Sequence, residues 1–90
     1  MPEKVKYDIF YAGVRIGCIK CDIKSGNCWA NYRIDGKKKT YNFQCLWYDI
    51  PEAVLFAFYQ YNTDFNNDEV RKLSIAESKI PSVEENEDEC

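Results

Sequence analysis

The chain contains no histidine. Histidine is the usual general base near neutral pH, so its absence removes Ser-His and Cys-His catalysis and histidine-containing metal sites. The four glycines lie singly at turns or bulges, and none belongs to a phosphate-binding loop. The aspartates in the first half, such as Asp22 and Asp35, are scattered over strands and turns and suggest no paired-carboxylate site. We therefore expect a protein that is not an enzyme and needs neither a metal nor a cofactor.

The sequence also lacks a long apolar run and a signal peptide. The longest apolar run covers residues 53–59, far short of the ~20 residues that a membrane span needs. The N-terminal residues lead into no apolar segment. We expect no membrane association and a cytoplasmic location, which is the host cytoplasm if the protein is viral.

The five cysteines form no regular disulfide pattern, because their number is odd and their spacing irregular. Reducing compartments keep thiols free, so we expect five free cysteines, with Cys90 exposed in the tail. Cys18, Cys21, Cys28 and Cys45 also offer four zinc ligands, which leaves a zinc-stabilised structural domain as an alternative. The strand positions of Cys21, Cys28 and Cys45 favour small buried hydrophobic residues instead.

Charge divides the chain into two halves. Residues 1–48 carry nine Lys or Arg against four Asp or Glu, whereas residues 49–90 carry three against eleven. Five of those acids lie within residues 84–90, so the acidity of the chain comes mostly from its end. We expect one domain over residues 1–81 and a disordered acidic tail over residues 82–90.

The basic half alternates as strands do. Residues 5–11, 14–23, 28–34 and 37–48 predict four antiparallel strands joined by short turns. Asp35 and Gly36 form the strongest hairpin signal and place Trp29 opposite Asn42. One face then carries Cys28, Phe43 and Trp47, and a bulge at Gly17 and Cys18 keeps the second strand in phase.

The acidic half predicts a helix that covers this apolar face. Asp49 is the expected N-cap, Pro51 fits the first turn, and residues 53–61 continue the helix. Val54, Ala57, Phe58 and Tyr61 form the expected buried stripe, and Phe58 faces Phe43. Residues 68–79 fit either a short helix, which we favour, or an edge strand. The fold class is therefore α+β, a four-stranded antiparallel meander packed on one long helix with a short C-terminal element.

The sheet face that the helix does not cover is the main candidate for binding. Large apolar and Arg side chains there have the composition of protein-binding hot spots. The predicted contact surface consists of Phe10, Arg15, Trp29, Arg33, Leu46 and Tyr48. A secondary acidic surface consists of Asp64, Asp68 and Glu69.

These features favour a non-enzymatic protein-binding module. By type, the chain fits a small phage or viral anti-defence inhibitor, such as an anti-CRISPR-like protein, that occludes a partner surface. The expected partner is another protein, including a nucleic-acid-binding complex, or a second copy of the chain. The alternative is a nucleic-acid-binding module that uses the basic, aromatic sheet face. We do not expect direct nucleic-acid binding, because residues 1–83 carry a net charge of only +2.

Overall fold

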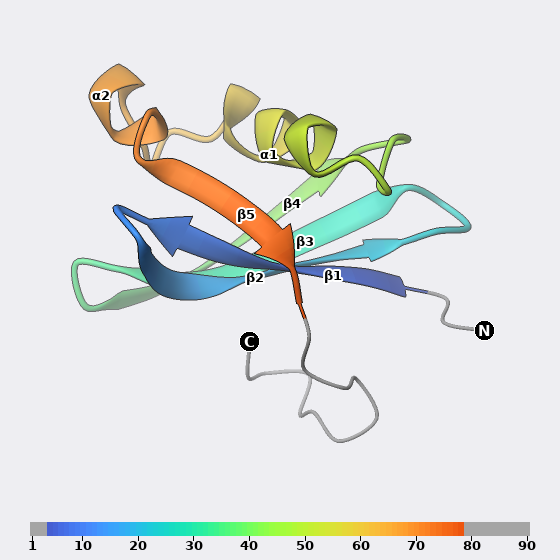
Figure 1. The fold of residues 1–90 in the computed structure, drawn as a ribbon, viewed down its shortest axis with the longest axis horizontal. Helices are drawn as coiled ribbons and strands as arrows, with labels where there is room; N and C mark the ends of the chain where they lie inside the picture. Colours follow the sequence, from blue (N-terminus) through green and yellow to red (C-terminus); the bar gives the residue numbers. More distant parts are fainter. Residues whose placement is uncertain (1–3, 79–90) are drawn as a thin grey trace.

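A five-stranded antiparallel sheet forms one layer of the structure, and two short helices lie on one of its faces (Figure 1). The computed structural model describes residues 4–78. The strands follow the order β4-β3-β2-β1-β5 across the sheet. The elements are β1 (Lys4–Tyr11), β2 (Val14–Asp22), β3 (Asn27–Ile34), β4 (Lys37–Gln44), α1 (Pro51–Gln60), α2 (Asn67–Val70) and β5 (Leu73–Glu77).

Two tight turns set the register of the meander. Asp35 and Gly36 both have positive φ, 53° and 76°, as a two-residue hairpin turn of type I′ requires. This turn pairs Ile34 with Lys37 and places Trp29 opposite Asn42, which confirms the predicted register. Ala12 and Gly13 make the corresponding turn between β1 and β2.

A bulge in β2, close to the predicted position, keeps the apolar side chains of the strand on the core face. Ile9 pairs with Gly17 but Phe10 pairs with Arg15, so Ile16 is the additional residue. A Cβ atom on Gly17 would come within 2.0 Å of the Asn31 carbonyl oxygen on β3. Glycine is therefore required here for the close approach of two backbones.

The region between β4 and α1 differs from the prediction. Strand β4 ends at Gln44 rather than residue 48, and the chain leaves the sheet after Cys45. Helix α1 is short and ends at Gln60, and its N-cap is Ile50, without a side-chain cap, rather than Asp49. The predicted strand failed because Cys45, Leu46, Trp47 and Tyr48 break the alternation that a one-sided strand requires.

Residues 68–79 were also assigned to the wrong element in part. A four-residue helix, α2, is followed by edge strand β5, which pairs with β1 and makes the sheet five-stranded. Leu73 and Ile75 face the core from β5, so the edge-strand alternative is the one that holds. Burial of these two side chains outweighs the weak helix signal of the surrounding charged residues.

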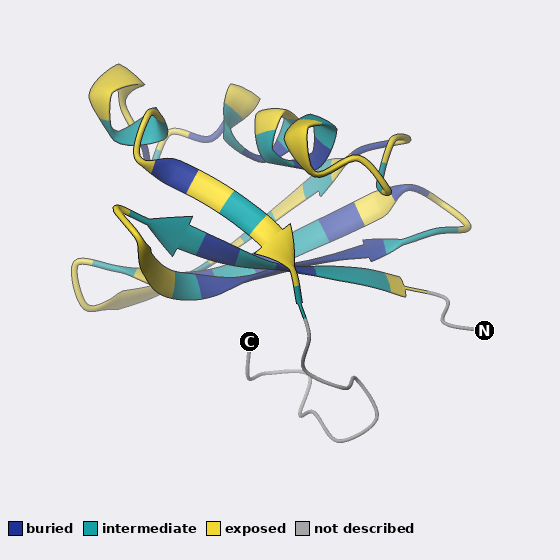
Figure 2. Cartoon of the chain, in the orientation of Figure 1, coloured by how far each residue is buried: buried dark blue, intermediate teal, exposed yellow. Residues whose placement is uncertain are grey.

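The core lies between α1 and the sheet, where buried segments face each other (Figure 2). It is organised around Phe58. The Phe58 side chain is fully buried, and its ring lies 6.0 Å from that of Phe43, which confirms the predicted contact. The Tyr32, Tyr41 and Phe65 rings lie at 5.4, 6.1 and 5.8 Å from it. Phe58 therefore fixes the helix and the following loop against β3 and β4.

A polar network holds the loop after α1 on the sheet. The buried Tyr32 hydroxyl donates a hydrogen bond to Asp64 and accepts one from the Asn62 amide at 3.1 Å. Lys39 Nζ lies 3.5 Å from the same Asp64 carboxylate. Burial and the hydrogen bond to Asp64 raise the pKa of Tyr32, so its hydroxyl stays protonated at neutral pH.

Among residues 4–78, no helix has the length and apolar character needed to cross a membrane. The expectations of a disordered acidic tail, of its boundary at residue 82 and of an exposed Cys90 lie outside the described residues.

Two phenylalanines of α1 provide a matched test of this packing. Phe58 is fully buried, whereas Phe56 is 51% exposed on the same helix. Phe58→Ala should lower the free energy of unfolding by about 3–5 kcal/mol, because it leaves a cavity among four rings. Phe56→Ala should change it by no more than about 1 kcal/mol. Chemical denaturation of both variants measures the difference, and equal losses would show that α1 is wrongly oriented.

Candidate protein-binding site

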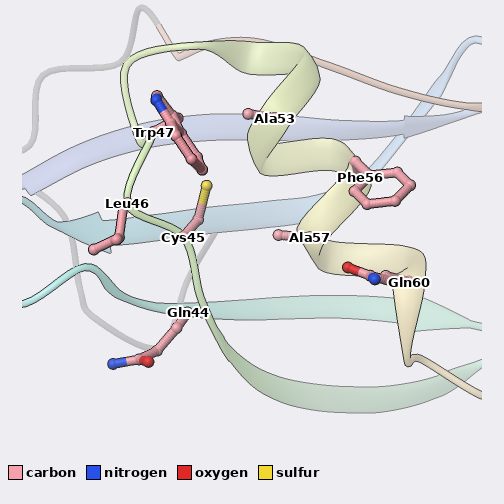
Figure 3. Close-up of a pocket in the computed structure, with 8 residues that line it drawn as sticks. All are labelled: Gln44, Cys45, Leu46, Trp47, Ala53, Phe56, Ala57 and Gln60. Atoms are coloured by element: carbon pink, nitrogen blue, oxygen red, sulfur yellow. The ribbon is translucent and has the colours of Figure 1, made fainter.

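An apolar groove of about 340 Å³ lies where the loop after β4 meets helix α1 (Figure 3). Three large apolar side chains near it are strongly exposed, namely Leu46, Trp47 and Phe56, with Trp47 at 62%. Single exposed apolar residues are ordinary on a protein surface, but a cluster around a hollow is typical of an interaction site. The groove is lined by Gln44, Cys45, Leu46, Trp47, Ala53, Phe56, Ala57 and Gln60. We call this set the Trp47 groove.

Helix α1 supplies one wall because it is apolar on two sides. Val54 and Phe58 are buried on the side that faces the sheet. Ala53, Phe56, Ala57 and Gln60 follow the spacing of a second helix stripe and line the groove. Of the expected buried stripe, Ala57 is half-buried against the core and also lines the groove, whereas Tyr61 is 78% exposed, which contradicts its expected burial.

The loop over residues 45–50 supplies the other wall. Cys45 donates its backbone N–H to the Gly26 carbonyl at 2.9 Å, which continues the pairing beyond the end of β4. The chain then turns, and the Trp47 carbonyl accepts a hydrogen bond from the Ile50 N–H at 3.0 Å. Figure 3 shows Cys45 and Trp47 opposite Ala53 and Ala57 across the groove. Trp47 was predicted to face the core, and the turn instead directs it outward.

Tyr7 anchors this loop from the core. Its hydroxyl donates a hydrogen bond to the Tyr48 carbonyl at 2.6 Å, although the two residues lie far apart in the sequence. Burial raises the pKa of Tyr7 to about 12, so the hydroxyl remains a donor at every physiological pH. The groove wall is therefore held in place rather than being a loose connection.

Two free thiols lie together in the core near the groove. Cys21 and Cys28 are directly opposite each other on β2 and β3, and their sulfur atoms are 2.8 Å apart. The hydrogen bond between them and burial raise the pKa of Cys21. Burial also raises the pKa of Cys45. The hydrogen bond with Cys21 lowers the pKa of Cys28. All three thiols are buried in the core, as expected for small hydrophobic side chains.

Cys18 corrects the expectation of five free thiols, because it is disulfide-bonded. Cys21, Cys28 and Cys45 are free. Among residues 4–78, no group of three or more Cys, Asp or Glu side chains has the geometry of a metal site.

The predicted contact surface is divided by the structure. Phe10, Arg15, Trp29 and Arg33 lie on the sheet face opposite α1, as the strand register requires. Leu46 lies in the Trp47 groove, and Tyr48 packs against the core. Phe10 belongs to β1 and Trp29 to β3, so strand β2 separates these two aromatic residues.

Polar and charged side chains adjoin Trp29 on the sheet face opposite α1. Lys4 Nζ lies 5.0 Å from the centre of the Trp29 ring, and Lys20 and Asn42 are its cross-strand neighbours. Arg15, farther along β2, forms an ion pair with Asp8 at 3.0 Å. A shallow hollow of about 430 Å³ beside Trp29 is lined by polar Asn27, Asn42 and Gln44 and by apolar Cys28 and Phe43. Trp29 is only half-buried, but the lysine over its ring occupies one stacking surface that a nucleic-acid base would need.

The predicted acidic surface consists largely of residues with structural roles. Asp64 is engaged by Tyr32 and Lys39. Glu69 and Asn66 form a capping box at the start of α2, with hydrogen bonds of 2.8 and 2.9 Å. Asp68 is exposed in the first turn of the same helix.

Sequence reasoning missed Trp47 and Phe56, although the sequence contains a signal for each. Residues 45–48 are all apolar, which a strand with one solvated face cannot accommodate. Residues 53–59 are apolar on every side of the helix, yet a single sheet layer can bury only one side. Both patterns indicate apolar surface that the domain cannot cover with its own sheet.

Removal of the Tyr7 hydroxyl tests how the groove wall is held. Tyr7→Phe should lower the free energy of unfolding by about 1 kcal/mol. It should also speed amide hydrogen exchange in residues 46–50, because the Tyr48 carbonyl loses its donor. Exchange measured by NMR gives the local effect, and unchanged exchange there would contradict the anchoring role.

The same variant has a pH signature. A folded-state pKa of about 12 lies above the unfolded value of 10, so neutral Tyr7 contributes stability below pH 10. That contribution is lost as the pH rises through about 12. Tyr7→Phe should therefore lose stability less steeply than the unmodified chain over this range in alkaline denaturation.

Comparison with protein-family models, with curated proteins and with solved structures finds no match to this chain.

Proposed function

We propose that this protein is a non-enzymatic binding module that captures a segment of another protein in the Trp47 groove. The occupant is a segment with a large apolar side chain, which would pack between Trp47 and helix α1. Such a module would act as an inhibitor by occupying a surface that its partner needs. The observation that carries the proposal is the cluster of exposed Leu46, Trp47 and Phe56 around a formed groove.

The composition of the groove supports a protein ligand. Tryptophan is among the residue types that contribute most to protein–protein binding, and aromatic residues are enriched at interfaces. Gln60 is the polar side chain at the rim of the groove, whereas the Gln44 amide points away from it and donates a hydrogen bond to Asn27 at 2.9 Å (Figure 3). An apolar floor with a polar rim is the usual anatomy of a protein interface.

The rigidity of the groove supports the proposal as well. Tyr7 holds the loop wall, and Phe58 holds the helix wall. A preformed site loses less conformational entropy on binding than one that must be ordered. This favours a specific partner over unspecific adhesion of an exposed apolar patch.

The face around Trp29 stays a second candidate surface, as predicted from the sequence. It includes Arg15 and Arg33 at its margins, and Arg is enriched at binding hot spots. Trp29 and Trp47 lie in different places, so variants of the two residues separate the two surfaces.

The test compares three baits, the unmodified chain, Trp47→Ala and Trp29→Ala, in a lysate of the native host. The retained protein is identified by mass spectrometry and purified, and its affinity for each bait is measured by calorimetry. Trp47→Ala should weaken binding by about 30-fold, which corresponds to about 2 kcal/mol for a hot-spot residue. Its melting temperature should be nearly unchanged, since the side chain is already exposed. Trp29→Ala should weaken binding by no more than about threefold.

The reverse result would assign partner binding to the other candidate surface. Loss of binding with Trp29→Ala but not with Trp47→Ala would place the contact on the sheet face opposite α1. If all three baits retain the same proteins with equal affinity, neither surface is the binding site.

A further inference from the structure

We infer that the partner segment binds in an extended conformation as a sixth strand along β4, and that it carries acidic residues beside its apolar anchor. This inference rests on the proposed function and specifies how the Trp47 groove is used. The juxtaposition that supports it is an open strand edge that runs directly into the groove at Gln44 and Cys45.

Strand β4 is the last strand on its side of the sheet in the described part of the chain. The two-residue turn makes Ile34 and Lys37 a hydrogen-bonded pair, so Lys39, Tyr41 and Phe43 also bond to β3. The intervening residues direct their backbone N–H and C=O groups away from β3. The outward-facing backbone groups are those of Lys38, Thr40, Asn42 and Gln44. They form the ladder that an added strand requires.

The open edge and the groove are continuous. Gln44 is the last residue of β4 and also lines the groove, and the next residue, Cys45, forms part of its wall. A strand added along β4 would direct alternate side chains toward the α1 side of the sheet. There they would first meet the half-buried Tyr41 and Phe43 and then enter the groove beside Phe56. One extended segment would therefore hydrogen-bond to the outward backbone groups of β4 and also place an apolar side chain in the groove.

Charge defines the chemistry of that segment. Residues 36–48 contain three lysines and no acid. Lys39 is paired with Asp64, whereas Lys37 and Lys38 are exposed and form no ion pair within residues 4–78. Acidic residues in the added strand would lie beside these two ammonium groups. Cross-strand pairs of opposite charge stabilise pairing, whereas like charges oppose it.

The same lysines disfavour a second copy of the chain as the occupant. Pairing of two β4 strands would bring two sets of three lysines into one edge without a carboxylate from either strand. Lysines on edge strands are a common protection against such self-pairing. An acidic segment is not repelled by these lysines. The β4 edge therefore favours an acidic partner segment over a second copy of the chain.

The experiment selects peptides from a displayed library of random linear sequences, with the full chain as target. Selected peptides should share acidic residues and a large apolar residue, and their affinity should fall as salt is raised. Hydrogen exchange of the full chain with the best peptide bound should show an alternating pattern. The amides of Lys38, Thr40, Asn42 and Gln44 should gain protection, while those of Lys39, Tyr41 and Phe43 should not change.

A proline variant with a matched control provides the second measurement. Asn42→Pro removes an outward N–H without removing a bond to β3, a position where strands tolerate proline. Asn42→Pro should weaken the selected peptide at least tenfold, whereas Asn42→Ala should bind it as the unmodified chain does. Circular dichroism checks that both variants are folded.

Three outcomes would overturn the inference. Protection confined to groove residues, without alternation along β4, would refute strand addition and leave the proposed function intact. Concentration-dependent dimerisation that protects the same alternate amides would make a second copy the occupant. Selected peptides without acidic residues, whose affinity does not depend on salt, would refute the charge preference. Binding unaffected by Trp47→Ala would instead refute the proposed function itself.

Discussion

Burial of Phe58 is the constraint on which the rest of the structure depends. Its ring contacts four other rings that come from β3, β4 and the loop after α1. A helix turns by about 100° per residue, so Phe56, two residues earlier, must point roughly away from the sheet. The same packing that fixes α1 therefore exposes Phe56. The groove is a geometric consequence of how the core is closed.

The short helix also explains why apolar surface remains near β4. Ten residues of α1 cover part of one sheet face, and the loop before it must cross from the end of β4 to the helix start. That loop is held by Tyr7 and by the Gly26 carbonyl, which fix its backbone but leave Leu46 and Trp47 outside the core. A small domain has few elements with which to cover such residues. A partner strand could bury them.

The sequence predicted the parts of the fold that local rules govern. The turn at Asp35 and Gly36 gave the correct register because its geometry admits one pairing. The contact between Phe43 and Phe58 followed from that register and from the helix stripe. The bulge in β2 was predicted at Gly17 and Cys18, one residue from the observed additional residue, Ile16. It was predicted because Val14 and Ile16 alternate out of step with the rest of the strand.

The remaining features depend on contacts that local patterns do not contain. The end of β4 depends on the turn after Cys45, in which the Ile50 N–H bonds to the Trp47 carbonyl and the chain leaves the sheet for α1. Strand β5 exists because β1 offers an edge to Leu73 and Ile75, although its sequence fits a helix as well. The candidate surface shifted for the same reason. Leu46 was expected beside Trp29, but the early end of β4 carries it into the groove with Trp47.

The exposure of Trp47 is the central claim, and fluorescence quenching measures it directly. In the variant Trp29→Phe, Trp47 is the single tryptophan of the chain. Its emission should be red-shifted and strongly quenched by acrylamide at all protein concentrations, because the side chain is 62% exposed. The complementary variant Trp47→Phe reports on half-buried Trp29 and should be quenched less. A blue-shifted, shielded Trp47 at the lowest concentration would contradict the groove as described.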